Sequence, residues 1–541
     1  MSRAEKTRKT IEPAALAAAR ARLARATGKQ RVDLILDAPD PQALVRALPA
    51  DELYLTVREV GLGDAADLVQ LASAEQFRTF LDLDAWKGGE LAPRRALPWL
   101  RAARAGANGS PQAARRWAAK LHLLDRELLH LVLRGALRVH DLEADQDPVI
   151  VSTRFMRTPE SKFVLEFEVD GAEYLAVRGI VDDLIAEDPF TATRLFSALA
   201  WDLPSELEES ERRWRDARLA DLGYPSPEEA LSWFARPPGQ PAVQAGAPAR
   251  PPGFWLATFR RGALLDRAVD RLDPAARDAV EAELVGAANA VLVADAVDPG
   301  DPAAVRAAVE AARATLELGL EALSGGDESR AAEALERTPL KRIFQHGFLR
   351  LLELRWRAER LFKAGGAGTP SAPLLDAPLG EATAALVRRR PAFFPGLELP
   401  REEWGELAAR AFTPRHFLSA DEVARAGAAL ELGEGLAALA RELGLSPPDL
   451  AQREPPRLSV LYLTALANER LGRAFSPAPL DAAELPRAAA LLATIDDPRL
   501  AARGEAGALL LELARHRVEE LAPLRDGGEV PAAHQGALLV R

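Results

Sequence analysis

The stretch from Trp201 to Phe234 constrains the fold most, because its own residues specify two helices and the turn between them: WDLPSELEESERRWRDARLADLGYPSPEEALSWF. Ser205 and Glu208 form a capping box, which predicts a helix that starts just after Ser205. Gly223 can adopt the left-handed conformation at which a helix commonly ends. The start signals of the next helix are a second capping box with proline at the first helical position, namely Ser226, Pro227 and Glu229.

The first of these helices carries glutamates ahead of arginines, an orientation that gives helical ion pairs of about 0.3–0.5 kcal/mol each. On one interpretation these pairs only stabilise the helix. On the other, the planar guanidinium groups bind an anion or a phosphate, for which their geometry is suited. Because the glutamates are available to neutralise the arginines, the sequence favours the first interpretation. The candidate anion or partner contacts are Arg212, Arg215, Arg218 and Trp214.

Length and composition limit the class of protein. At 541 residues the chain is too long for one hydrophobic core, and its many alanines, leucines, arginines and glutamates favour helix over sheet. The net charge of -11 argues against a general affinity for nucleic acid or anionic membranes. The absence of cysteine excludes disulfides and thiolate metal sites. No apolar run approaches the roughly 18 residues of a spanning helix, so we expect a cytoplasmic protein without membrane insertion.

The first 147 residues divide into two segments. Residues 1–30 are basic and form either an arm that binds a partner or nucleic acid, or a solvated, partly frayed helix, which the behaviour of chain termini favours. From residue 31, short amphipathic segments follow one another, and each has too few apolar residues to be stable alone. They must therefore stack in a solenoid-like layer. The expected N-caps of these helices are Asp40, Asp51, Asp64 and Ser73.

Residues 111–148 predict a pair of helices and contain a group of histidines with acidic neighbours. Metal binding typically needs two imidazoles on one helical face, at positions i and i+4. His122 and His130 are off that spacing, and the acids that follow His140 lack the glycine and the distal glutamate of a calcium loop. We therefore expect no metal site and interpret these residues as surface charge.

β-Branched and aromatic residues interrupt the helical pattern between Val149 and Glu168. The runs VIVSTRFM and KFVLEF flank the turn sequence RTPES, which predicts a β-hairpin. A hairpin alone is marginally stable, so it must pack on the helices. After Asp170 and Gly171 the helical period returns, although this dipeptide could also turn a second hairpin. A further helix is expected over residues 190–200.

The second half of the chain is expected to be helical between breaks rich in proline and glycine. A long helix is predicted over Thr338–Lys363, and a nearly wholly buried one in RLSVLYLTALANERLGRAF. The expected organisation is a basic extension (1–30), a domain of stacked short helices (31–147), the hairpin with the capped helix pair (148–236), a linker (237–253), a helical domain with the long helix (254–365), a second linker (366–380), a helical C-terminal region (381–526) and a loose tail (527–541).

None of the common catalytic and nucleotide-binding motifs occurs here with the neighbouring residues that it requires. The sequence GLGDAA at 61–66 matches a loose dinucleotide fingerprint, but a helical pattern rather than a strand precedes it. The glycines at 365–368 lack the Lys-Ser or Lys-Thr of a phosphate loop, and no G-x-S-x-G motif is present. We therefore assign no catalytic, cofactor-binding or metal-binding residue, although catalytic carboxylate pairs would leave no motif.

Several blocks of the sequence resemble a known family. The block LPSELEESERRWRDARLADLGYPSPEEAL carries the most specific likeness, and RVDLILDAPDPQALVRALPADELYLTVREVG, FLDLDAW, LKRIFQHGF, RRRPAFFPGL and LTALANERLG extend it over most of the chain from residue 31. They resemble a family of bacterial proteins known only as a domain of unknown function, number 6178. The resemblance implies no activity, cofactor or catalytic residue. The short stacked helices are also similar in pattern to the cytosolic domain of magnesium transporters and to flagellar motor-switch proteins.

We therefore expect a mainly α, multi-helical protein with a solenoid-like N-terminal layer, one small β-hairpin and a helical C-terminal half. The expected function is that of a non-enzymatic protein–protein interaction or scaffold protein. The alternative is an enzyme or a protein that binds an anion or phosphate ligand near the Arg-rich helix at 206–222.

Overall fold

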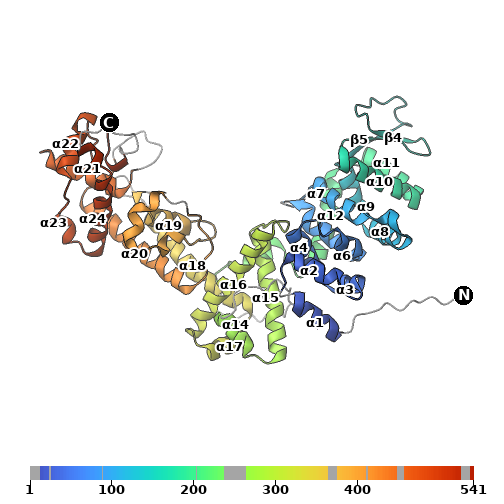
Figure 1. Ribbon diagram of the computed structural model, residues 1–541, viewed down its shortest axis with the longest axis horizontal. Helices are drawn as coiled ribbons and strands as arrows, with labels where there is room; N and C mark the ends of the chain where they lie inside the picture. Colours follow the sequence, from blue (N-terminus) through green and yellow to red (C-terminus); the bar gives the residue numbers. More distant parts are fainter. Residues whose placement is uncertain are drawn as a thin grey trace. The chain divides into compact units, whose positions relative to one another are not determined.

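The computed structural model is mainly α-helical with two small β-sheets, which confirms the predicted fold class (Figure 1). By their contacts the residues form two compact units. Unit 1 comprises residues 1–235, 240–313 and 332–341, and unit 2 comprises residues 236–239, 314–331 and 342–541. The structure describes residues 13–23, 26–87, 89–202, 204–236, 263–363, 374–409, 412–447, 456–525 and 536–541.

Several predicted segments lie wholly or partly outside these described ranges. They include residues 1–12, 24 and 25 of the basic extension, the linker at 237–253, residues 254–262 at the start of the next domain, residues 364–373 around the second linker, and residues 527–535 of the tail. Within the described residues, no helix is long and apolar enough to cross a membrane.

Unit 1 begins with the predicted succession of short helices. Each alone buries few apolar side chains, but together they enclose a continuous core around the stacked rings of Tyr54 and Trp99, whose centroids are 5.5 Å apart. Leu23 of the basic extension is buried in the same core. The helices are α1 (Pro13–Leu23), α2 (Gly28–Leu36), α3 (Pro41–Ala47), α4 (Ala50–Val60), α5 (Ala66–Leu71), α6 (Ala74–Asp84), α7 (Pro93–Arg104), α8 (Pro111–Leu123) and α9 (Arg126–Arg134).

Two of the four predicted N-caps are confirmed. Asp40 accepts a hydrogen bond from the backbone N–H of Ala43 ahead of α3, and Ser73 forms a capping box ahead of α6. The other two predictions are wrong, because Asp51 lies inside the first turn of α4 and Asp64 lies two residues before α5. An acidic residue in the first turn is also favoured by the helix dipole, so acidity near a helix start does not identify the cap itself.

The predicted hairpin is confirmed as β4 (Phe155–Arg157) and β5 (Phe163–Phe167), which pair antiparallel. A third strand, β3 (Leu137–Asp141), pairs antiparallel with the other side of β5, so the order is β3-β5-β4. The prediction of helix at residues 137–141 is wrong. Their apolar residues continue the leucine-rich pattern of α9, and only pairing with β5 makes them a strand. A second, two-stranded sheet consists of β1 (Trp86–Lys87) and β2 (Glu90–Leu91).

Helices again follow the three-stranded sheet, as the sequence predicts. Gly223 has a φ of +85°, and Ser226 and Glu229 form the predicted capping box with Pro227 at its start. The preceding helix begins at Pro204 rather than after Ser205. The helices are α10 (Gly171–Glu187), α11 (Pro189–Trp201), α12 (Pro204–Asp221), α13 (Pro227–Ser232), α14 (Leu264–Asp270), α15 (Pro274–Ala294), α16 (Pro302–Ser324), α17 (Glu328–Arg337) and α18 (Leu340–Lys363).

In unit 2, α16 and α18 cross with their backbones in contact at two glycines. A Cβ atom on Gly319 would overlap the carbonyl oxygen of Ile343, and one on Gly347 would overlap that of Thr315. Only glycine allows this approach. The later elements are α19 (Leu379–Leu386), the 3₁₀ helices η4 (Pro395–Glu398) and η5 (Arg401–Ala409), α20 (Ala420–Glu442), α21 (Leu458–Arg470), α22 (Leu485–Leu491), α23 (Pro498–Ala501), α24 (Gly504–Glu519) and α25 (Ala522–Arg525).

The two helices predicted most directly in this half are confirmed. α18 is the long helix, and α21 is buried from Leu458 to Asn468. The last six residues, expected to be loose, instead pack against other residues of unit 2. The backbone N–H of Leu539 donates to Thr464 Oγ1, and that of Arg541 donates to the carbonyl of Leu480. These hydrogen bonds satisfy backbone polar groups that become buried when the apolar residues of the tail pack.

Candidate functional site

Arg218, the last candidate arginine of α12, lies among three carboxylates from different elements of unit 1. Its Nε and Nη2 donate to the two oxygens of Asp82 on α6, both at 2.8 Å. Nη1 donates to Asp125 Oδ2, just before α9, at 2.9 Å, and Nη2 also donates to Glu211 Oε1 at 2.6 Å. These bonds use most of the donors of one guanidinium group. Arg218 therefore joins α12 to the helical layer and is occupied by the chain's own carboxylates.

The electrostatics of this cluster centre on Glu211, whose side chain is fully buried. Burial raises the pKa of Glu211 to about 7, and neighbouring Asp125 and Asp82 add to the effect, although Arg218 opposes it. Its Oε2 has no hydrogen-bond partner. Burial alone would lower the pKa of Arg218. The hydrogen bonds to Asp82 and Glu211 outweigh this effect, so the pKa of Arg218 is raised overall. One cation thus faces three acids, and burial raises the pKa of Asp82 as well as that of Glu211.

The other candidate residues of α12 point in different directions. Arg215 Nε donates to the backbone carbonyl of Asp82 at 2.7 Å, and its guanidinium lies 5.3 Å from the centre of the Trp86 ring. Trp214 is 65% exposed, and Arg212 is exposed without a hydrogen bond or ion pair to the described residues. The structure therefore brings Arg215 and Arg218 together on the inner side of α12 and separates them from Arg212 and Trp214.

Glu208 shows why the first capping box fails. Its Oε1 accepts a hydrogen bond from the backbone N–H of Leu91 in β2 at 2.7 Å. The carboxylate thus fixes α12 to the two-stranded sheet, and tertiary contact replaces the local cap that the sequence spacing predicts.

The three histidines lie apart, each in its own surroundings. His122 pairs with Glu187 at the surface, His140 pairs with Glu166 at 2.8 Å, and His130 is buried. Burial lowers the pKa of His130. Among the residues that the structure describes, no three histidine or acidic side chains are grouped so that they could hold a metal ion.

A second charged network of unit 1 gives no sequence signal. The buried Asp84 accepts hydrogen bonds from Tyr54 Oη at 2.8 Å, Trp99 Nε1 at 2.7 Å and Arg95 Nη2 at 3.0 Å. Arg95 also binds both oxygens of Asp298 at 2.7 Å. A Cβ atom on Gly300 would lie 2.5 Å from Arg95 Nη2 and 2.6 Å from Asp84 Oδ1. The network therefore fixes the loop at 298–300 to the N-terminal layer, and it requires glycine at 300.

Another buried carboxylate holds an exposed segment against the three-stranded sheet. Glu166 of β5 is almost completely buried, and its Oε1 accepts hydrogen bonds from the backbone N–H groups of Val151 at 2.7 Å and Ser152 at 2.6 Å. Its other oxygen binds His140. Burial opposes the charge of Glu166, but these hydrogen bonds lower its pKa overall. The segment that displays Val149 and Val151 is thus fixed to the sheet.

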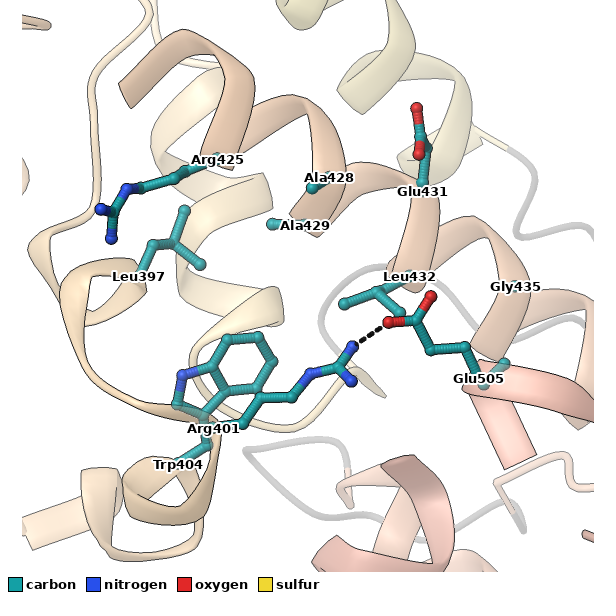
Figure 2. Close-up of a pocket in the computed structure, with 11 residues that line it drawn as sticks. Leu397, Arg401, Trp404, Arg425, Ala428, Ala429, Glu431, Leu432, Gly435 and Glu505 are labelled. Atoms are coloured by element: carbon teal, nitrogen blue, oxygen red, sulfur yellow. Dashed lines mark hydrogen bonds and ion pairs between the residues drawn. The ribbon is translucent and has the colours of Figure 1, made fainter. Parts of the chain in front are cut away.

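Unit 2 contains an open pocket of about 460 Å³ between the 3₁₀ helices and α20, with the start of α24 at one end. Figure 2 shows Trp404 and Leu397 on one side and Ala428, Ala429 and Leu432 of α20 on the other. No local pattern in the sequence indicates this pocket. Its remaining lining residues are Arg401, Arg425, Glu431, Gly435, Glu505 and Ala506.

The fold and these sites define a mainly α-helical protein with two small β-sheets and ionic networks between its helices. The model of a family of unknown function, DUF6178, matches residues 8–524, so the chain belongs to this family. The match includes every site described above and confirms the resemblance seen in the sequence. No curated protein and no solved structure matches the chain.

Proposed function

We propose that this protein is a non-enzymatic interaction or scaffold protein of the bacterial cytoplasm. The observation that carries the proposal is the number of exposed large apolar side chains in one stretch of unit 1, residues 149–214. Eleven large apolar side chains are exposed among the described residues, and seven of them lie between residues 149 and 214. These seven are Val149, Val151, Phe155, Leu175, Phe190, Trp201 and Trp214.

The way in which these side chains are held supports binding to another protein. Val149 and Val151 are 83% and 82% exposed, although their segment is tied to β5 through Glu166. A fixed backbone that displays apolar groups loses little conformational freedom on binding. Exposed tryptophans such as Trp201 and Trp214 belong to the residue type that contributes most to protein interfaces. These exposed side chains therefore support binding to another protein.

The charges of unit 1 support the same proposal. Arg218 is bound by three carboxylates, so a phosphate ligand would have to displace one of them from a partly buried site. Such a displacement would leave an acid unpaired. The ionic cluster is best explained as a device that fixes α12.

The test is affinity purification of the tagged full-length protein from its own host, followed by mass spectrometry. The matched variant is Val149→Asp with Val151→Asp, which changes exposed side chains and leaves Glu166 in place. We expect specific partners with the wild-type protein and a loss of at least tenfold in their recovery with the variant. Equal recovery from both proteins would contradict a role for this surface.

The alternative is an anion or phosphate site at 206–222, and the convergence of Arg215 and Arg218 on the inner side of α12 favours it. Under this alternative, phosphate would raise Tm above the value in chloride of equal ionic strength, and Arg215→Ala would remove the rise. Equal Tm values in the two salts would exclude it.

A further inference from the structure

The rim of the unit 2 pocket holds charged side chains, and most of them are paired. Arg401 Nη2 lies 2.6 Å from Glu505 Oε1, so this pair closes one end of the pocket (Figure 2). Glu431 lies 3.8 Å from Arg357. Arg425 is exposed on α20 and has no hydrogen bond or ion pair to any residue that the structure describes. Arg425 is therefore the charged lining residue for which the described chain supplies no counter-ion, whereas Arg357, the partner of Glu431, also pairs with Glu434 at 3.1 Å.

Inside this charged rim the lining is apolar. Trp404 is 7% exposed and its Nε1 donates to the carbonyl of Leu399 at 3.3 Å, which fixes the indole ring. Leu397 and Leu432 contribute aliphatic surface, and small residues of α20 leave space between them. Gly435 allows α20 to lie close to α24, because a Cβ atom there would lie only 3.2 Å from Ala506 Cβ. The pocket can therefore take up a large apolar side chain.

We propose that this pocket binds a segment of a partner protein in which an acidic residue neighbours a large apolar side chain. The proposal rests on the proposed function, but it uses a different surface from the one in unit 1. The apolar side chain would enter between Trp404 and α20, and the carboxylate would pair with Arg425, whose planar guanidinium suits a carboxylate. Arginine is one of the residue types enriched among the side chains that contribute most to protein interfaces.

The charges of the site favour an acidic segment over a basic one. A basic segment would place its cation near Arg425, and both lining carboxylates, Glu431 and Glu505, already have arginine partners of their own. An acidic segment pairs with Arg425 and leaves the Arg401–Glu505 pair intact. The occupant is thus defined by chemistry, as a short acidic and apolar peptide segment.

The experiment selects a random 12-residue peptide library, displayed on phage, on the full-length protein. We expect the selected peptides to combine Asp or Glu with Leu, Phe or Trp. A synthetic peptide with the selected sequence is then measured by fluorescence polarisation against the wild-type protein and three single variants. Arg425→Glu reverses the proposed contact, Ala428→Phe fills the pocket from an exposed position, and Arg487→Glu is the matched control.

Arg487 on α22 is exposed and, like Arg425, forms no ion pair with the described residues. We expect Arg425→Glu and Ala428→Phe to weaken binding at least tenfold, Arg487→Glu to change it less than twofold, and a peptide with lysine at the acidic positions to bind Arg425→Glu better than the wild-type protein. The proposal is overturned if no peptide is selected, or if Arg425→Glu and Ala428→Phe bind as the wild-type protein does. These results leave the unit 1 variant test unaffected, so the two proposals fail separately.

Discussion

Arg218 in unit 1 and Arg425 in unit 2 are the same type of residue in opposite situations. Arg218 donates to three carboxylates from three separate elements. Arg425 lies at the edge of an apolar pocket, without a counter-ion in the described chain. Both lie on helices with glutamates close in sequence. Local sequence therefore does not decide which arginine is free to bind a partner. Carboxylates that are distant in sequence accept hydrogen bonds from Arg218, and none does so from Arg425 in the described chain.

The largest expected effect comes from removing the paired arginine. Arg218→Ala leaves the buried Asp82 and Glu211 without their cation, and breaking such a cluster destabilises a protein by about 3–5 kcal/mol. The measurement is urea unfolding of the full-length protein followed by circular dichroism, with the loss expected in the transition of unit 1. A change of less than about 1 kcal/mol would mean that the cluster is solvated and that the contrast with Arg425 is false.

The second prediction concerns pH. Because the pKa of Glu211 is about 7 in the fold and near 4.3 in an unfolded chain, the folded state holds more protons between these values, and stability falls as pH rises through this window. The expected loss is about 3–4 kcal/mol, because each pKa unit of this difference corresponds to about 1.4 kcal/mol. Glu211→Gln, which keeps the shape and carries no charge, should flatten this part of the pH profile of unfolding. Glu209→Gln is the control, since Glu209 is exposed and pairs with Arg213.

The third prediction tests a different set of paired arginines. Gly300→Ala places a methyl group against Arg95 and the buried Asp84, which Tyr54 and Trp99 hold in place. Overpacking of this kind destabilises a protein by about 1–3 kcal/mol. Gly286→Ala serves as control, because a Cβ atom on Gly286 has no neighbour within 4 Å. Equal unfolding midpoints for the two variants would show that the network adjusts freely.

The smallest expected effect on stability belongs to the unpaired arginine. Arg425→Ala removes no hydrogen bond or ion pair to the described residues, so the free energy of unfolding should change by less than about 0.5 kcal/mol. The measurement is the same urea titration. A loss of more than about 1 kcal/mol would show that Arg425 has a structural partner and would remove the basis for a binding role.

The sequence predicted well the features that depend on residues close together in the chain. The capping box at Ser226 and Glu229, the left-handed Gly223, the long helix α18 and the hairpin of β4 and β5 all follow from short-range patterns. It failed at β3, because the apolar run after α9 fits either a helix or a strand until its partner is known. It failed at the tail for the same reason, since the contacts of Leu539 and Arg541 lie far back along the chain.

The features of the candidate site also divide into those that local sequence predicts and those that depend on tertiary contacts. By itself the sequence determined the family, the helical class and the identity of the Arg-rich helix, because helix propensity, capping and periodicity act over a few residues. Only the tertiary structure decided that Glu208 binds Leu91 rather than its own helix start, that Asp82 and Asp125 meet Arg218, and that a pocket opens beside Arg425. Ionic and apolar contacts of this kind join residues remote in sequence, so no local pattern encodes which carboxylate reaches which arginine.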